Sequence, residues 1–600
     1  MECSVCLQDY ALPSRVPQVL NCGHTFCSSC LEQVANAGKF RCPTCREESS
    51  ATEIRVNFAL RDALVGKESP STVAASRIIE AEAIDPPTED EEAVTLRMQA
   101  TGAEDEMLIS IVPPLGSVRA PSDICCVVDV STSMAAEAML ADGAGVSVSH
   151  GLALIDIVKH ALRTVIHLLN GRDRLALVAY SNTARVILEL TPMTAEGQQR
   201  AELRLHQLLP DGMTNIWAGL EAGIQLLAAA SDGMRLQHLL LLTDGIPNIN
   251  PPRGIVPMLK RLKEKCGGRL PCSVNTFGFG YELDSELLHE LARLGSASYA
   301  FIPDAGFVGT VFVNAVTNLL VTMGANPVLK LTASGGISLS PCAVPGGLAI
   351  KQAAGGLQVD LSGLQFGQSR HVLLRPSVAS DAHSAISLTL EYDTRSRARR
   401  SVSLCCMLCD LLPAEEGIAQ KSRVLLVDGV RMAMRTLKQT QLDKLKEVPL
   451  PLPKAQELIT ELESSIRALG GSSEAVEALL EDLSGQVAEA FSREEWYTRW
   501  GVHFLPSLLC AHASQQCNNF KDPGVQHYGG DLFADLRDQA DEVFCSLEAP
   551  KPQLRSPPPP PPPPPVQMQA TPTSPPVCPA AAVRTAPLVD MSRYYDASAG

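Results

Sequence analysis

The sequence predicts a multidomain chain whose largest part is an α/β, doubly wound domain. A zinc-stapled finger precedes it, and a β-sandwich-like segment, a helical segment and a disordered proline-rich tail follow it. Cysteines and one histidine occur in close pairs over residues 1–46, strand-like and helix-like patterns alternate over residues 120–325, and prolines fill positions 557–565. A length of 600 residues leaves room for about three or four domains.

The overall composition argues against two classes of partner. A net charge of −16 does not suit a nucleic-acid or anionic membrane surface, and no apolar run approaches the ~18 residues of a membrane span. Seven of the 19 cysteines belong to the N-terminal pairs, and we expect the others to be buried thiols in a reducing compartment. We therefore predict a cytoplasmic or nuclear protein with no nucleic-acid partner and no membrane span.

The N-terminal pairs have the spacing and the chemistry of two zinc sites. Their order is Cys3-x2-Cys6, Cys22-x-His24, Cys27-x2-Cys30 and Cys42-x2-Cys45. Thiolate and imidazole are preferred zinc ligands, and eight of them supply two tetrahedral sites. Because the segment at 1–50 is too short to bury a core, zinc binding must supply the free energy that folds it.

This order of three cysteines, one histidine and four cysteines resembles a RING finger. The resemblance implies cross-bracing, with one zinc held by Cys3, Cys6, Cys27 and Cys30 and the other by Cys22, His24, Cys42 and Cys45. It also implies a ubiquitin ligase, which has no nucleophile of its own. Such a ligase holds a ubiquitin-conjugating enzyme and its thioester-linked ubiquitin in a reactive pose.

Four residues match positions at which RING fingers contact the conjugating enzyme or ubiquitin. Val5, Val34 and Pro43 stand at the positions that dock the conjugating enzyme. Arg46 follows the last ligand, where the resemblance implies contact with both ubiquitin and the enzyme, and we assign it the catalytic role. The alternative is a zinc-stapled interaction module without transfer activity.

The α/β domain begins with an apolar strand that runs into a cluster of oxygen ligands. Ile124–Val128 is a continuous apolar run, typical of a strand buried on both faces. Asp129, Ser131 and Ser133 follow at alternate positions of one short loop, where their oxygens can face one point. Such oxygens suit a hard cation such as magnesium. The alternative is that these residues only close a turn and cap a helix.

Strands and helices then alternate. We predict helices at 151–170, 195–209, 215–230, 284–295 and 307–323, and strands at 174–180, 185–190, 237–243, 272–279 and 298–302. This alternation predicts a parallel sheet with helices on both faces and a ligand at the carboxyl ends of its strands.

Residues 120–325 therefore resemble a von Willebrand factor A domain with its metal-ion-dependent adhesion site. The family's motif maps onto Asp129, Ser131, Ser133, Thr214 and Asp244. The resemblance implies one magnesium or other divalent cation with an open position. That position favours an Asp or Glu side chain of a protein substrate.

The spacing of apolar and charged residues also predicts the structure of the regions on either side of the α/β domain. Residues 51–92 are predicted to hold a short helix at 51–66 and an acidic linker, and residues 93–119 two strands. Residues 326–412 have β-sandwich spacing, and we expect the two early strands to join that later sheet. The α/β domain would then be an insertion.

Residues 413–550 are predicted to be helical, with apolar spacing at 420–439, 453–469 and 473–491. Residues 518–530 resemble the segment that follows the A domain in proteins with a Hedgehog/intein-type module. His503, His512 and His527 are assigned no role, because isolated histidines in a packed segment are usually structural.

Residues 551–600 form the proline-rich tail, for which we predict polyproline II structure. A spacer is the default role of such a tract, and an SH3-like, WW-like or profilin-like partner is the other reading.

These features support one leading hypothesis and two alternatives. The leading hypothesis is a RING-type ubiquitin ligase that recruits a protein substrate through a metal-dependent von Willebrand A domain. The alternatives are a non-enzymatic zinc-stapled scaffold and the N-terminal part of a self-processing precursor with a Hint-type module.

The paired ligands predict two zinc ions per chain. Elemental analysis of residues 1–66 should find two, and a value of one or none would remove the double-site assignment. Replacing Cys27 should unfold the finger, because a structural site that lacks a thiolate no longer offsets the loss of chain entropy.

Overall fold

The computed structural model describes most of the chain between residues 93 and 550 and short N-terminal pieces. The described residues are 17–19, 25–28, 30–31, 39–41, 48–50, 55–56 and 93–550, the last range without 102–105, 117, 142–146, 231, 305–306, 354, 379–383, 409–410, 443–449, 472 and 520. The chain divides into two units, Met1–Pro552 and Gln553–Gly600, and all described residues belong to the first. The predicted proline-rich tail therefore lies outside them.

The middle of the chain forms a six-stranded sheet that is parallel except at one edge. In spatial order its strands are β12 (Ala184–Pro192), β11 (Arg174–Tyr180), β8 (Ser122–Asp129), β13 (Leu236–Thr243), β14 (Ser273–Phe279) and β15 (Tyr299–Ile302). The edge strand β12 is antiparallel to β11, and the other neighbours are parallel. Every residue of the central strands β8 and β13 is buried, as expected of strands covered on both faces.

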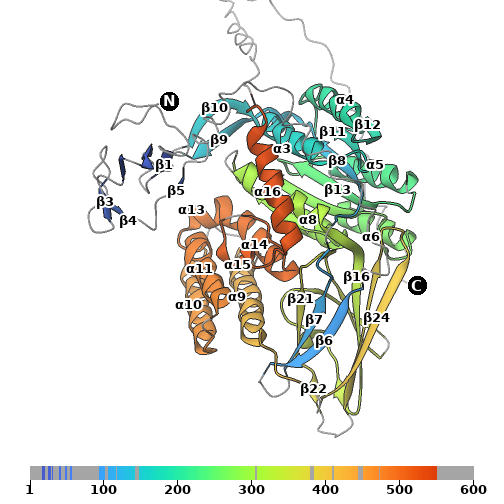
Figure 1. The fold of residues 1–600 in the computed structure, drawn as a ribbon, viewed down its shortest axis with the longest axis vertical. Helices are drawn as coiled ribbons and strands as arrows, with labels where there is room; N and C mark the ends of the chain where they lie inside the picture. Colours follow the sequence, from blue (N-terminus) through green and yellow to red (C-terminus); the bar gives the residue numbers. More distant parts are fainter. Residues whose placement is uncertain are drawn as a thin grey trace, which may run out of the picture. The chain divides into compact units, whose positions relative to one another are not determined.

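Helices cover both faces of this sheet (Figure 1). One face packs against α3 (Leu154–Leu168), α4 (Ala195–His206) and α8 (Val308–Leu320), and the other against α5 (Ile216–Ala229), α6 (Ile255–Lys265) and α7 (Ser285–Leu294). Helix α5 lies so close to β8 that a Cβ added at Gly219 would come within 2.9 Å of Val127. The predicted doubly wound α/β fold is confirmed.

Strands from both sides of this domain in sequence form a β-sandwich together. β6 (Thr95–Ala100) pairs with β7 (Met107–Val112), and β7 pairs with β21 (Arg370–Leu374). The second sheet contains, in order, β18 (Ala349–Ala353), β19 (Gly356–Asp360), β16 (Thr322–Ser334), β23 (Ala385–Asp393) and β24 (Arg399–Met407). Shorter elements are β17 (Ile337–Ser338), η5 (Pro341–Ala343), β20 (Leu364–Gln365) and β22 (Ser377–Val378). One apolar core contains residues of both sheets, so the α/β domain is inserted between strands of the sandwich.

After β24 the described chain is helical. Its elements are α9 (Gly417–Leu442), α10 (Leu452–Ala468), α11 (Glu474–Asp482), η7 (Leu483–Val487), α12 (Ala488–Ala490), α13 (Glu494–Trp496), η8 (Tyr497–Gly501), α14 (Val502–Ser514), α15 (Pro523–Gln526) and α16 (Asp531–Ser546). The single helix predicted at 473–491 is interrupted by the π-helical turn η7, where Gly485 has φ −87° and ψ −111°. Among the described helices, none combines the length and apolar character that a membrane span needs.

The N-terminal pieces are short strands. β1 (Pro17–Val19) pairs with β2 (Thr25–Cys27) and β5 (Arg55–Val56), and β3 (Lys39–Arg41) pairs with β4 (Glu48–Ser50). The helix predicted at 51–66 is wrong at positions 55–56, where the β-branched Val56 pairs with β1. The rest of that predicted helix lies outside the described residues.

The sequence patterns missed three elements near the α/β sheet. Strands β9 (Glu137–Ala141) and β10 (Ser147–Ala153) pair with each other before α3. Helix α6 was missed because Pro257 interrupts its pattern, although a proline is tolerated in the first turn of a helix. The expectation of buried thiols holds for Cys125, Cys126, Cys272 and Cys517 and is wrong for four exposed cysteines, which are Cys266, Cys342, Cys405 and Cys545.

Residues 514–519, which run from the last residue of α14 toward α15, connect the α/β domain with the sandwich. The Gln515 side chain exchanges two hydrogen bonds with the backbone of His371 on β21, at 2.9 and 3.0 Å. Two residues later, the Cys517 carbonyl accepts a 2.6 Å hydrogen bond from the Asn318 amide on α8. Because this irregular segment is buried, its polar groups need such partners, and they hold the two domains to it.

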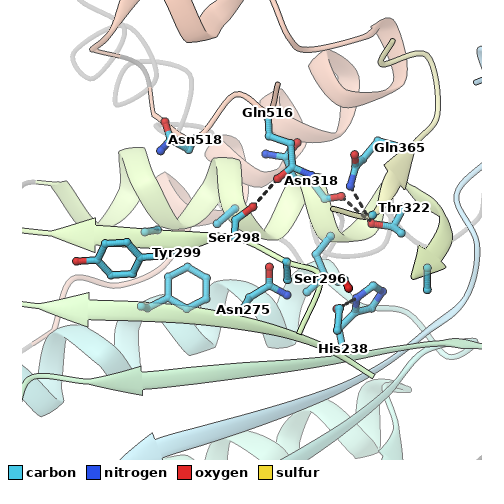
Figure 2. A pocket seen from close by; sticks show the side chains of 18 of the residues that line it. His238, Asn275, Ser296, Ser298, Tyr299, Asn318, Thr322, Gln365, Gln516 and Asn518 are labelled. Atoms are coloured by element: carbon cyan, nitrogen blue, oxygen red, sulfur yellow. Dashed lines mark hydrogen bonds between the residues drawn. The ribbon is translucent and has the colours of Figure 1, made fainter. Parts of the chain in front are cut away.

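A cavity of about 50 Å³ with polar and apolar residues in its wall lies beside this segment (Figure 2). His238 of β13 faces it, and Ser298 donates a hydrogen bond to Gln516 across it. Nε2 of His238 and Oδ1 of Asn318 are buried and have no hydrogen-bond partner among the described residues. The cavity has room for roughly three to five water molecules, which can bond to such atoms. Burial lowers the pKa of His238 to about 3, so its ring is neutral.

The start of β8 depends on one buried ion pair, and this dependence can be tested. Asp173 is 0% exposed and accepts two hydrogen bonds from Arg119, at 2.9 and 2.6 Å, and one each from the Ser122 and Asn170 backbone. Asp173→Ala should lower the free energy of unfolding by about 3–5 kcal/mol, because it leaves the Arg119 charge buried without its partner. Chemical denaturation of the full chain measures this.

The matched control is Glu196→Ala. Glu196 forms an exposed ion pair with Arg200 on α4, so its removal should cost less than about 1 kcal/mol. Equal effects of the two substitutions would show that the Asp173 pair does not anchor the strand.

Candidate functional site: an oxygen-ligand cluster at the carboxyl ends of β8 and β13

The loop after β8 folds back on the last residue of that strand. The Asp129 carboxylate accepts a 2.8 Å hydrogen bond from the backbone N–H of Ser131. The chain then enters the 3-10 turn η3 (Thr132–Ala135), which places the Ser131 and Ser133 hydroxyls 3.0 Å apart. This turn brings the three oxygen-bearing side chains of the Asp-x-Ser-x-Ser motif to one side of the strand end.

The neighbouring strand β13 supplies the second carboxylate. Asp244 follows the last residue of β13 and accepts a 2.9 Å hydrogen bond from the Ser133 hydroxyl. Thr243, the residue before it, donates a 2.6 Å hydrogen bond to Asp129. Because β8 and β13 are parallel neighbours, their carboxyl ends meet at this edge of the sheet.

Thr214 reaches the same point from the loop before α5. A Cβ built on Gly245 would lie 3.6 Å from both the Thr214 and the Ser133 hydroxyl oxygens, so these two hydroxyls face one small space. Asn248 holds Thr214 there, since its side chain accepts from the Thr214 N–H at 2.8 Å and its own N–H donates to the Thr214 carbonyl at 3.1 Å.

The five residues predicted from the motif are thus brought together, and most are buried. Asp129, Ser131, Thr214 and Asp244 are at most 4% exposed, whereas Ser133 is exposed. Burial raises the pKa of Asp129 above its ordinary value, against the effect of its hydrogen bonds from Thr243 and Ser131. Burial and the nearby Asp129 charge raise the pKa of Asp244 to about 7.

This donor set fits a divalent cation. Its side-chain donors are all oxygens, two from carboxylates and three from hydroxyls, which is the chemistry that magnesium and calcium prefer. No lysine, arginine or histidine among the described residues forms an ion pair with Asp129 or Asp244. Two buried carboxylates this close repel each other, and a cation is the group that would remove the repulsion.

Sequence reasoning missed three supporting residues. Thr243 and Tyr180 both donate to the second oxygen of Asp129, the latter over 3.2 Å, and Asn248 positions Thr214. Tyr180 ends β11 directly beside Asp129 in the parallel register. Thr243 could have been suspected from its place next to Asp244, whereas nothing in the sequence pattern marks Asn248.

Of the predicted zinc ligands, Cys27 and Cys30 belong to the described residues, and both are buried. The other six ligands lie outside the described residues, as do the docking positions Val5, Val34 and Pro43 and the assigned catalytic residue Arg46.

The histidines that were assigned no role do not form a set. His503 lies 2.6 Å from the Ser285 hydroxyl, and His512 lies 2.7 Å from the Tyr528 hydroxyl. His527 is exposed. The described residues contain no group of three or more His, Cys, Asp or Glu side chains able to hold a metal.

Three family models match separate parts of the chain. Residues 3–43 match the RING-type zinc-finger, residues 123–306 the von Willebrand factor type A domain, and residues 473–542 the VWA / Hh protein intein-like family. The second match contains all five residues of the oxygen-ligand cluster.

A curated relative and two solved structures are also similar to parts of this chain. Inter-alpha-trypsin inhibitor heavy chain H3 of Pongo abelii is 26% identical over 233 residues, which are 36% of this chain and 24% of that protein. The chain thus spans about a quarter of the length of that relative.

The two structures are a von Willebrand factor type A protein from Catenulispora acidiphila and the ArnB paralog VWA2 from Sulfolobus acidocaldarius. The first is 14% identical with a TM-score of 0.44, and the match covers 65% of this chain and 89% of that one. The second is 12% identical with a TM-score of 0.43, and the match covers 70% of this chain and 97% of that one. The family matches identify this chain as one that carries a RING-type zinc finger, a von Willebrand factor A domain and a VWA/Hh intein-like segment.

Proposed function

We propose that this chain is a RING-type ubiquitin ligase that recruits a protein substrate through a divalent cation on its A domain. One observation carries the proposal. The chain with the RING match also holds two buried carboxylates, Asp129 and Asp244, that have no cationic partner among the described residues. The finger supplies a surface for the transfer machinery, and the A domain supplies a surface for the substrate.

The transfer step requires positioning and no nucleophile from this chain. A substrate lysine amine attacks the thioester carbonyl that joins ubiquitin to the conjugating enzyme, an isopeptide bond forms, and the enzyme's cysteine thiolate leaves. Val5, Val34 and Pro43 dock the conjugating enzyme in this proposal. Arg46 donates to ubiquitin and to the enzyme at once and so restricts the thioester to reactive poses.

The A domain acts by orienting oxygens toward one cation. Asp129 is fixed by hydrogen bonds from Thr243 and Tyr180, and Thr214 is fixed by Asn248. The serine and threonine hydroxyls would hold the cation without cancelling its charge, because they are neutral. A bound magnesium would supply residual positive charge and an open coordination position, which favours a carboxylate of the substrate.

The competing candidate function is that of a zinc-stapled scaffold, which binds partners without transferring ubiquitin. It shares both metal sites with the ligase, so metal content does not separate the two. Discharge of ubiquitin from a loaded conjugating enzyme onto free lysine does, because a scaffold leaves the discharge rate at its value without the protein.

Two substitutions in the finger should separate binding of the conjugating enzyme from stimulation of ubiquitin discharge. Val5→Ala should weaken the affinity for the conjugating enzyme about tenfold, because it removes two methyl groups from the docking surface. Arg46→Ala should leave that affinity nearly unchanged and slow ubiquitin discharge by roughly tenfold to a hundredfold. Calorimetric titration and a single-turnover discharge assay measure the two effects.

Both variants of the finger must retain their zinc, which elemental analysis checks. The ligase proposal is wrong if the parent chain discharges no ubiquitin with any of a panel of conjugating enzymes. It is also wrong if both variants keep full activity.

Magnesium binding should depend on Asp129. Asp129→Asn keeps an acceptor for the Thr243 and Tyr180 hydroxyls and removes the charge, so the fold should remain and magnesium affinity should fall at least about tenfold. Calorimetric titration of magnesium into the full chain measures the affinity.

The matched control for this variant is Asp211→Asn. Asp211 is an exposed acid on the loop before Thr214, and it is not part of the oxygen cluster. Its substitution should leave magnesium affinity unchanged. Equal loss in both variants would indicate a general effect of surface charge and would remove the site assignment.

A further inference from the structure

We infer that the metal-site face has an apolar subsite, formed by Met213 and Ile246, which selects partners whose carboxylate stands next to an apolar side chain. The inference rests on the proposed metal-dependent recruitment and adds to it the chemistry of the partner. The partner is a protein segment in which an Asp or Glu is one or two residues from an aliphatic or aromatic residue.

Two large apolar side chains are exposed beside the oxygen cluster. Met213 is 47% exposed and Ile246 is 58% exposed. Single exposed apolar residues are ordinary on protein surfaces, but a grouped pair next to a ligand site commonly belongs to that site.

The geometry places this pair around the cation position. Met213 directly precedes Thr214, and Ile246 directly follows Gly245. The Cβ position of Gly245 is 3.6 Å from the Thr214 hydroxyl, so the two apolar residues belong to the two loops that meet at the oxygen cluster. A carboxylate bound at that point would bring its neighbouring side chains against them.

The two loops that carry the pair are bonded to each other. Asn248 on the Ile246 loop exchanges hydrogen bonds with the backbone of Thr214 on the Met213 loop. The Met213 N–H also donates a 2.8 Å hydrogen bond to the Asn182 side chain. These contacts fix the spacing of the two side chains before a partner arrives, which reduces the entropy lost on binding.

The stretches of the two loops nearest the oxygen cluster carry few charges. Residues 212–220 and 245–252 contain no Asp, Glu, Lys or Arg, and the exposed charged residues nearest to Met213 and Ile246 on the two loops are Asp211 and Arg253. The cation therefore chooses the carboxylate, and apolar contact is the chemistry that remains for its neighbours.

A peptide selection tests the inference without a known partner. A displayed library of random 12-residue peptides is selected on the full chain in magnesium and eluted with chelator. We expect the eluted peptides to contain an Asp or Glu with an apolar residue within two positions. A set of peptides that chelator releases but that shows no apolar preference would overturn the subsite.

Variants then locate the subsite. Met213→Ser and Ile246→Ser should each weaken the best peptide about tenfold, and neither should change the affinity of the same peptide after its apolar residue is replaced by serine. The control Leu203→Ser removes an apolar residue that is 65% exposed on α4 and should have no effect. Unchanged affinity in the two site variants would overturn the inference.

Magnesium titration separates this failure from failure of the proposed function. The two site variants should bind magnesium as the parent does, because neither side chain belongs to the oxygen cluster. If the parent binds no magnesium and yields no peptide that chelator releases, metal-dependent recruitment fails and the subsite fails with it. If magnesium binds and chelator releases peptides, but the variants have no effect, only the subsite is wrong.

Discussion

A buried ion pair between Arg119 and Asp173 fixes the first residue of strand β8. The oxygen cluster at the last residue of the strand depends on that anchor. Asp173 accepts from the Arg119 guanidinium and from the Ser122 N–H, where β8 begins. From there β8 runs between β11 and β13, and the parallel register places Tyr180 beside Asp129. A shift of one residue would turn every side chain of this strand to the opposite face. The ion pair therefore acts on the geometry of the oxygen cluster from the other end of the sheet.

The two carboxylates at the ends of β8 differ in what surrounds them, and this difference separates a structural role from a binding role. Asp173 has a guanidinium and two backbone N–H donors, so its charge is matched within the protein. Asp129 is equally buried, but its described donors are neutral, and Asp244 adds a second negative charge nearby. A buried charge without an opposite charge destabilises a fold. Such an arrangement is expected where an external cation completes the site.

The sequence was sufficient for the parts of this molecule that follow from local pattern. The apolar run Ile124–Val128 predicted the central strand, and the motif predicted five residues that the fold brings together. Tyr180 and Asn248 were missed because their roles depend on strand register and on contact between two loops, which no local periodicity records. The interruption of the helix at Gly485 was missed for the opposite reason, since the apolar spacing continues across it.

The two ends of strand β13 have different roles. One end lies where the α/β domain contacts the sandwich, and the other end carries part of the oxygen cluster. His238, near its start, faces the cavity beside residues 514–519, where the chain's own side chains hold the α/β domain to the sandwich. Asp244 follows its last residue, about 20 Å further along at the rise of an extended strand. Polar groups at the first end are mostly bonded to the chain itself. At the second end the described chain supplies oxygens but no cationic side chain, so the charge of Asp129 and Asp244 has no opposite charge within the described residues.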